Sequence, residues 1–212
     1  MSQNIILITI DSLRADHLIL NAIKQKTKKV LKVDGFLFKT LRQLYKTTTK
    51  NYIPYASAEY INQIVLNWIK NKKSEKFFLF IHYMDVHMPY IPQAQHLEEL
   101  GCKSISDEKE MWKLNEKNPE NITSHELKKL IYLYDAKVRH VDHEIGFLIN
   151  ILNELNILEN STLIITADHG DEFMEHGSLG HSAKLYDELL LLLCQFIHIY
   201  IFHEICICMF SS

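Results

Sequence analysis

The stretch "LIITADHGDEFMEHGSLGH" (residues 163–181) joins an apolar, β-branched run to a dense group of acids and histidines. A short apolar run of this kind is typical of a buried strand, and this one ends at Asp168 and His169. A similar stretch, "NIILITIDSLRADH" (residues 4–17), stands near the N-terminus, and its apolar run ends at Asp11. The repetition raises the question of whether the two segments build one site.

The composition is that of an ordinary globular protein with one substantial domain. The chain has 212 residues, of which 47% are hydrophobic and 23% are charged, so it can bury a real core. The net charge of -3 offers no basic stripe, and we therefore expect no nucleic-acid partner. The apolar run near the N-terminus is far shorter than a secretory signal, so the sequence predicts a cytoplasmic protein.

The pattern along the chain alternates strands with helices. Further buried strands are expected at residues 76–83 and 161–167, besides the run at 4–10. Helical patterns cover residues 19–31, 36–48, 57–71 and 124–157. This alternation predicts an α/β fold with a mainly parallel central sheet and helices on its faces.

Two features complete the predicted domain. Residues 94–122 are polar and weakly periodic, which indicates an insertion with short helices. The longest helix takes Ser124 as its predicted N-cap, and because Leu127 stands three positions further on, no capping box is expected. One domain over residues 1–190 is therefore predicted, followed by a separate tail.

The tail, residues 191–212, is apolar on every face but is interrupted by Gln195, His198, His203 and Glu204. These polar residues argue against a membrane span, so membrane association is not expected. Two alternatives stay open: a buried pair of strands, or sequence foreign to the fold, as after a frameshift.

Polar side chains follow all three predicted strands. Asp11 follows the first, His87 the second, and the pair Asp168 and His169 the third. Since the carboxyl ends of parallel strands lie at one edge of a sheet, where such sheets bind ligands, these residues are predicted to share a crevice.

The chemistry of this group suits a divalent cation and an oxyanion ester. Carboxylates favour calcium or magnesium, and imidazole admits manganese or zinc. His87 and His181 could transfer protons or donate hydrogen bonds, and Lys184 could offset charge on the ester oxygens. His82 and Asp85 are predicted to orient neighbouring side chains. Asp171, Glu172 and Glu175 are predicted to form the first turn of the next segment.

Four blocks of the sequence resemble the sulfatase family, part of the alkaline-phosphatase-like superfamily. The blocks occur in the family's order. They are "NIILITIDSLRADHL" (4–18), "FFLFIHYMDVHMPYIP" (77–92), "LYDAKVRHVDHEIGFLINIL" (133–152) and "TLIITADHGDEFMEHGSLGHSAKLYDELL" (162–190). The resemblance implies an α/β/α sandwich that hydrolyses sulfate esters of small molecules or glycans, with one divalent cation, usually calcium.

The resemblance also implies roles for individual residues. Asp11, Asp168 and His169 would be the metal ligands. His87 and Lys184 would contact the sulfate group, and His181 would lie beside them. Ser12 stands where many members have a second Asp, which would remove one carboxylate from the metal site.

The family's nucleophile motif is missing. Sulfatases use a formylglycine made from Cys or Ser in a C/S-x-P/A-x-R motif, and residues 17–76 contain no such motif. The distance between the first two strands is also shorter than in the family, so a truncated or internally deleted member with impaired turnover is expected. The alternatives are a phosphodiesterase, phosphonate hydrolase or phosphoethanolamine transferase-like enzyme of the same superfamily, and a non-catalytic remnant or anion-binding protein.

Overall fold

The fold is described from a computed structural model. It covers residues 4–14, 16, 53, 55–71, 76–102, 105, 107–181, 184–190, 193–198 and 206–209. The helices predicted over 19–31 and 36–48 lie outside these residues.

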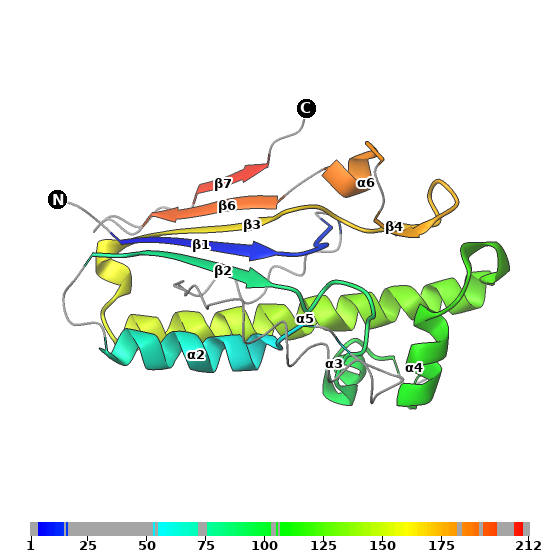
Figure 1. The fold of residues 1–212 in the computed structure, drawn as a ribbon, viewed down its shortest axis with the longest axis horizontal. Coiled ribbons are helices and arrows are strands. Elements are labelled where there is room, and N and C mark those ends of the chain that lie inside the picture. The colour runs from blue at the N-terminus through cyan, green and yellow to red at the C-terminus, as the bar shows by residue number, and fades with distance from the viewer. Residues whose placement is uncertain are drawn as a thin grey trace, which may run out of the picture.

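A five-stranded sheet forms the centre of the molecule (Figure 1). Strand β1 (Asn4–Ile10) lies between β2 (Phe78–Tyr83) and β3 (Ser161–Ala167), and both neighbours run parallel to it. All three strands are rich in β-branched or aromatic residues, which favour the extended conformation. The predicted parallel sheet is therefore confirmed.

The sheet continues beyond β3 with two antiparallel strands. Strand β6 (Leu193–His198) pairs with β3, and β7 (Cys206–Met209) pairs with β6, so the strand order is β2-β1-β3-β6-β7. Both strands lie in the segment that the sequence set apart as an apolar tail. No helix within the described ranges combines the length and apolar character needed to cross a bilayer.

Two helices cover one face of the sheet. Figure 1 shows α2 (Ala58–Asn71) and α5 (Ser124–Glu154) lying side by side beneath the strands. Alternate strand residues, such as Ile6, Ile8 and Leu163, are almost fully buried and share one core cluster with residues of both helices, as expected where successive side chains point to opposite faces. Together with the parallel strands, this arrangement is a partial α/β sandwich.

Short elements fill the remaining connections. They are α3 (Ala94–Glu99), α4 (Glu108–Asn115), the 3-10 turns η2 (Pro119–Asn121) and η3 (Leu158–Asn160), the hairpin strands β4 (Glu172–Phe173) and β5 (Leu179–Gly180), and α6 (Asp187–Leu190). The predicted insertion over 94–122 thus contains α3, α4 and η2.

The start of α5 corrects one prediction. Thr123, not Ser124, is the N-cap: its side chain accepts from the backbone N–H of Glu126, and the Glu126 carboxylate accepts from the backbone N–H of Thr123. A capping box is therefore present. The prediction was wrong because it placed the cap one residue late, which put Leu127 where the glutamate belongs.

Candidate metal and anion site

Three polar side chains lie on the same face of the sheet because side chains alternate between the two faces along each strand. Thr9 and His82 are direct neighbours in the β1–β2 register. Asp11 lies two residues beyond Thr9, and Asp168 lies two residues beyond Thr166, which is the β1–β3 partner of Thr9. Because side chains repeat with period two along a strand, His82, Asp11 and Asp168 emerge together at the carboxyl edge.

Asp11, Asp168 and His169 form a group suited to a metal ion. One ligand atom from each lies within 4.8 Å of the others, and Nε2 of His169 is 3.8 Å from Oδ1 of Asp11. Two carboxylates and one imidazole are a common donor set for divalent cations. The three residues therefore fit the cation that the sequence predicted.

The surroundings of Asp11 keep its carboxylate ionised. Burial alone would raise its pKa, but hydrogen bonds with His82 and Ser12, together with the nearby His87 and His169, lower the pKa to about 2. Ser12 donates its hydroxyl to Oδ1 of Asp11 and its backbone N–H to Oδ1 of Asp168. Ser12 has a positive φ of 58°, which turns the chain so that both donors face the carboxylates.

Three histidines at the site have their Nδ1 atoms engaged with oxygens that can only accept. Nδ1 of His87 lies 2.5 Å from the carbonyl of Met88, and Nδ1 of His169 lies 3.0 Å from the carbonyl of Gly170. Nδ1 of His181 lies 3.0 Å from the Asp171 carboxylate. Each Nδ1 must therefore carry the proton, and in the neutral ring Nε2 is left as an acceptor or metal ligand.

The three rings form a continuous cluster. The ring centroids of His169 and His181 are 4.3 Å apart, and those of His87 and His181 are 5.0 Å apart. The residues come from three separate segments: His87 follows β2, His169 follows β3, and His181 follows β5. A ligand bound here would meet imidazoles from three segments of the chain.

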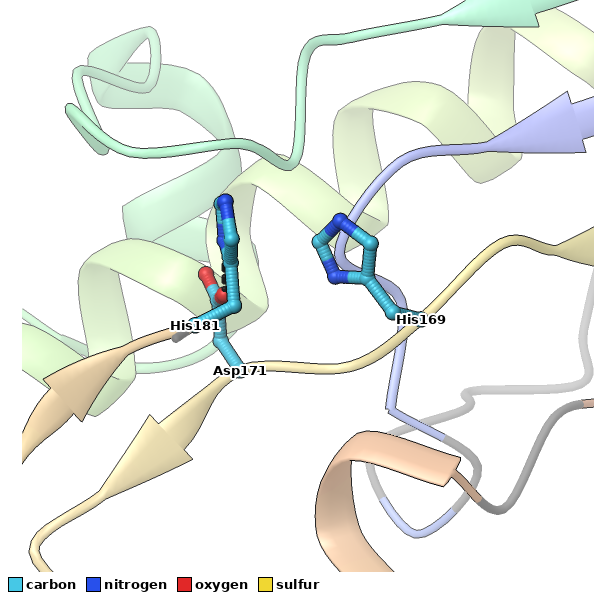
Figure 2. Close-up of side chains that lie close together, drawn as sticks. All are labelled: His169, Asp171 and His181. Carbon is cyan, nitrogen blue, oxygen red and sulfur yellow. Dashed lines mark hydrogen bonds and ion pairs between the residues drawn. The ribbon is translucent and has the colours of Figure 1, made fainter. Parts of the chain in front are cut away.

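A small hairpin holds His181 in this cluster. Glu172 pairs with Gly180 across β4 and β5, so Asp171 and His181 face each other where the hairpin opens (Figure 2). Oδ2 of Asp171 accepts a hydrogen bond from the hydroxyl of Tyr90. Burial and the Asp171 charge raise the pKa of Tyr90 well above its usual value, so Tyr90 remains a neutral donor.

This hairpin overturns the prediction that Asp171, Glu172 and Glu175 form the first turn of the next segment. The chain instead reverses direction between Phe173 and Leu179. His169, Asp171 and His181 also form a second group with metal-ligand spacing. In this group His181 hydrogen-bonds one Asp171 oxygen and Tyr90 hydrogen-bonds the other.

Lys184 points into the hairpin. Its ammonium lies 2.9 Å from Oε2 of Glu172 and contacts the hydroxyl of Ser178. Burial would raise the pKa of Glu172, but the hydrogen bonds from Ser178, Lys184 and His176 lower it to about 2. Lys184 thus braces Glu172 here, and its predicted contact with sulfate stays a prediction.

Arg14 links the segment after β1 to the same hairpin. Its Nη1 donates to the carbonyl of Asp171 at 3.1 Å and to the carboxylate of Glu175 at 2.6 Å. Its backbone N–H donates to the hydroxyl of Tyr134 on α5, which itself donates to the carbonyl of Ser12. These bonds tie the Asp11 turn, α5 and the hairpin into one unit.

The structure therefore brings together five of the six predicted site residues: Asp11, His87, Asp168, His169 and His181. Asp85 lies deeper, 3.4 Å from Lys137 and 3.7 Å from Nε2 of His140. The sequence reading undervalued His82, whose Nε2 is 3.3 Å from Oδ2 of Asp11 and 4.0 Å from Oδ2 of Asp168. The sequence did contain a signal for His82. Side chains alternate between the two faces of a strand, and His82 is the polar residue near the carboxyl end of the run at 76–83.

The parallel sheet and the helices on one of its faces form a partial α/β sandwich, with an acid–imidazole cluster at the carboxyl edge. Residues 23–190 match the Sulfatase family, and the chain belongs to that family. An arylsulfatase from Clostridium perfringens is 24% identical over 130 residues, which are 52% of this chain and 27% of the arylsulfatase. The chain thus spans about a quarter of the length of this curated relative.

Solved structures share the fold. The C-terminal periplasmic domain of phosphoethanolamine transferase EptC from Campylobacter jejuni matches with a TM-score of 0.60 and 14% identity, over 93% of this chain and 79% of that domain. BT4656, solved in complex with its substrate D-glucosamine-2-N,6-O-disulfate, matches with a TM-score of 0.51 and 16% identity, over 66% of this chain and 42% of that one.

Proposed function

We propose that this protein binds a divalent cation and a sulfate ester at the carboxyl edge of its sheet, as a metal-dependent sulfuric ester hydrolase with impaired turnover. Asp11, Asp168 and His169 would hold the cation. His87 and His181 would bind the sulfate group of a small-molecule or glycan ester. Support comes from the family match and from the arylsulfatase relative.

One observation carries the proposal: the three imidazoles of His87, His169 and His181 meet beside the ionised Asp11. Their Nδ1 atoms are tied internally, so Nε2 is the nitrogen left for a ligand. Nε2 of His169 would bind the cation, and Nε2 of His87 and His181 would donate to a sulfate oxygen when it carries a proton. The carboxylates of Asp11 and Asp168 would repel an anion, so a cation that offsets their charge would favour anion binding. A bound cation would also polarise the ester oxygens.

The chain's own residues have distinct tasks in this proposal. His169 would hold the cation through Nε2, because its Nδ1–H is bonded to the carbonyl of Gly170, and such a partner orients a ligating imidazole. His181 would hydrogen-bond the ester, or protonate the leaving oxygen, through Nε2. Asp171 favours the charged form of His181, and the hydrogen bond between them raises the His181 pKa. No C/S-x-P/A-x-R motif is available to supply the nucleophile, which is why slow turnover is expected.

Calorimetry and a turnover assay on the purified chain test the proposal. We expect calcium, manganese or zinc to bind, and sulfate to bind only in the presence of the metal. Asp168→Asn should abolish metal binding, and His181→Gln should weaken sulfate binding while leaving the metal bound. Fast, metal-dependent hydrolysis of 4-nitrophenyl sulfate would contradict impaired turnover. Absence of both metal and anion binding would leave a non-catalytic remnant.

A second candidate keeps the site and changes the ester to a phosphoester or phosphonate. The histidine-rich surroundings and the single carboxylate at Asp11, followed by Ser12, favour it, because such a donor set suits zinc or manganese better than calcium. Parallel assays with 4-nitrophenyl phosphate, a bis-phosphodiester and 4-nitrophenyl sulfate separate the two candidates. A response to sulfate alone would remove the phosphoester candidate.

A further inference from the structure

His82 occupies a distinctive position at the predicted metal site. It is the penultimate residue of β2, and its imidazole extends from the sheet face that also carries Asp11 and Asp168. Nε2 of His82 lies 3.3 Å from Oδ2 of Asp11 and 4.0 Å from Oδ2 of Asp168. Nε2 of His82 is therefore within 4.0 Å of an oxygen of each carboxylate.

The orientation of the His82 ring is set from behind by the next strand. Nδ1 of His82 lies 2.8 Å from the hydroxyl of Thr9, and that hydroxyl donates its only proton to the carbonyl of Ile81. Thr9 can therefore accept the Nδ1–H of His82. Nε2 faces the carboxylates: when protonated it hydrogen-bonds Asp11, and without its proton it is placed as a ligand, with Nδ1 held as an internal partner holds it in a metal-bound histidine.

The spacing is that of two ligands of one ion. Zinc bonds to nitrogen and oxygen ligands are about 2.0–2.2 Å long, so tetrahedral ligand atoms lie about 3.3–3.6 Å apart. The separation between Nε2 of His82 and Oδ2 of Asp11 is 3.3 Å. His169 approaches the other oxygen of the same carboxylate, at 3.8 Å from Oδ1, so the Asp11 carboxylate lies between two imidazoles.

We propose that His82 is a fourth metal ligand. The ligand set is then two carboxylates, Asp11 and Asp168, and two imidazoles, His82 and His169. This inference rests on the proposed metal site and deepens it. The second nitrogen shifts the preference of the site away from calcium and toward zinc or manganese.

The test counts imidazoles around zinc bound to the 212-residue chain, by X-ray absorption spectroscopy, and measures zinc affinity by calorimetry. We expect two imidazoles in the wild type and one in His82→Gln. The dissociation constant should rise by more than about 100-fold, beyond the 10–100-fold cost of losing an outer-shell partner. Thr9→Val, which removes only the partner of Nδ1, should keep two imidazoles and weaken binding within that smaller range.

Matched variants make the result specific. His125→Gln changes an exposed histidine of α5 and should leave both the imidazole count and the affinity unchanged. His181→Gln should also leave the count at two. A count that falls in His181→Gln and not in His82→Gln would place the ion on the second group, with His169 and Asp171, and would overturn the inference.

The failures of the two proposals can be told apart. A wild-type count of one imidazole, with zinc binding lost in Asp168→Asn, would overturn the role of His82 and leave the metal site standing. The wild-type count decides this even if His82→Gln does not fold. Absence of zinc, manganese and calcium binding in the folded wild type would overturn both the ligand role of His82 and the proposed function.

Discussion

His181 donates a 3.0 Å hydrogen bond from Nδ1 to Oδ1 of Asp171, which is fully buried. The two residues are ten positions apart in the sequence and meet because β4 and β5 pair antiparallel just beyond them. The hydroxyl of Tyr90 donates a hydrogen bond to the other Asp171 oxygen. A buried carboxylate thus fixes which nitrogen of His181 the site presents.

Replacing Asp171 should free the His181 ring. Asp171→Ala leaves the buried Tyr90 hydroxyl without its acceptor, so we expect a loss of about 1–3 kcal/mol in the free energy of unfolding. NMR of the ¹⁵N-labelled imidazole should show a mixture of His181 tautomers. Asp171→Asn should restore much of the stability, and Tyr90→Phe should lower stability without changing the tautomer. An unchanged tautomer in Asp171→Ala would contradict this role.

Gly170 should tolerate no side chain. A Cβ there would lie 2.1 Å from the carbonyl oxygen of Glu188 and 3.0 Å from Cγ of Arg14, so the chain that carries Asp168 and His169 must shift. We expect Gly170→Ala to lower stability by about 1–3 kcal/mol and to weaken metal binding in calorimetry. The control is Gly101→Ala, at a positive φ with open space. It should cost about 1 kcal/mol and leave metal affinity intact; equal metal affinities in the two variants would refute the expectation.

The capping box of α5 should contribute measurably to stability. Thr123→Ala removes the acceptor for the backbone N–H of Glu126, and the expected cost is about 1 kcal/mol in urea denaturation. Thr123→Ser keeps the hydroxyl and should remain within a few tenths of the wild type. If Ser124 were the cap instead, Ser124→Ala would be the more costly substitution.

Glu172 should make stability depend on acid pH. Its folded pKa of about 2 lies below the ordinary value of 4.5, so its stabilising effect is present above pH 4.5 and is lost as the pH falls through about 2. The difference in unfolding free energy between the wild type and Glu172→Gln should therefore shrink from pH 5 to pH 2. Glu159→Gln, at an exposed position of η3, is the control. A constant difference for Glu172→Gln would exclude this contribution.

Much of the fold was readable in the sequence because its main signals are local. The apolar runs at 4–10, 76–83 and 161–167 predicted the parallel strands, since a buried strand needs few polar residues. The helical period predicted α2 and α5 to within a few residues. The β4–β5 hairpin was missed because two-residue strands carry no readable period, and its acids resemble the first turn of a helix.

The sequence by itself determined which residues reach the carboxyl edge: parallel strands end there together, so Asp11, His87, Asp168 and His169 had to converge. Only the tertiary structure decided which of the candidate site residues are already hydrogen-bonded to other side chains. Lys184 is held by Glu172, and His181 is oriented by Asp171. His82 faces Asp11 because β1 and β2 share a register. The physical reason is that strand order and register set distances between remote residues, and no local pattern encodes those distances.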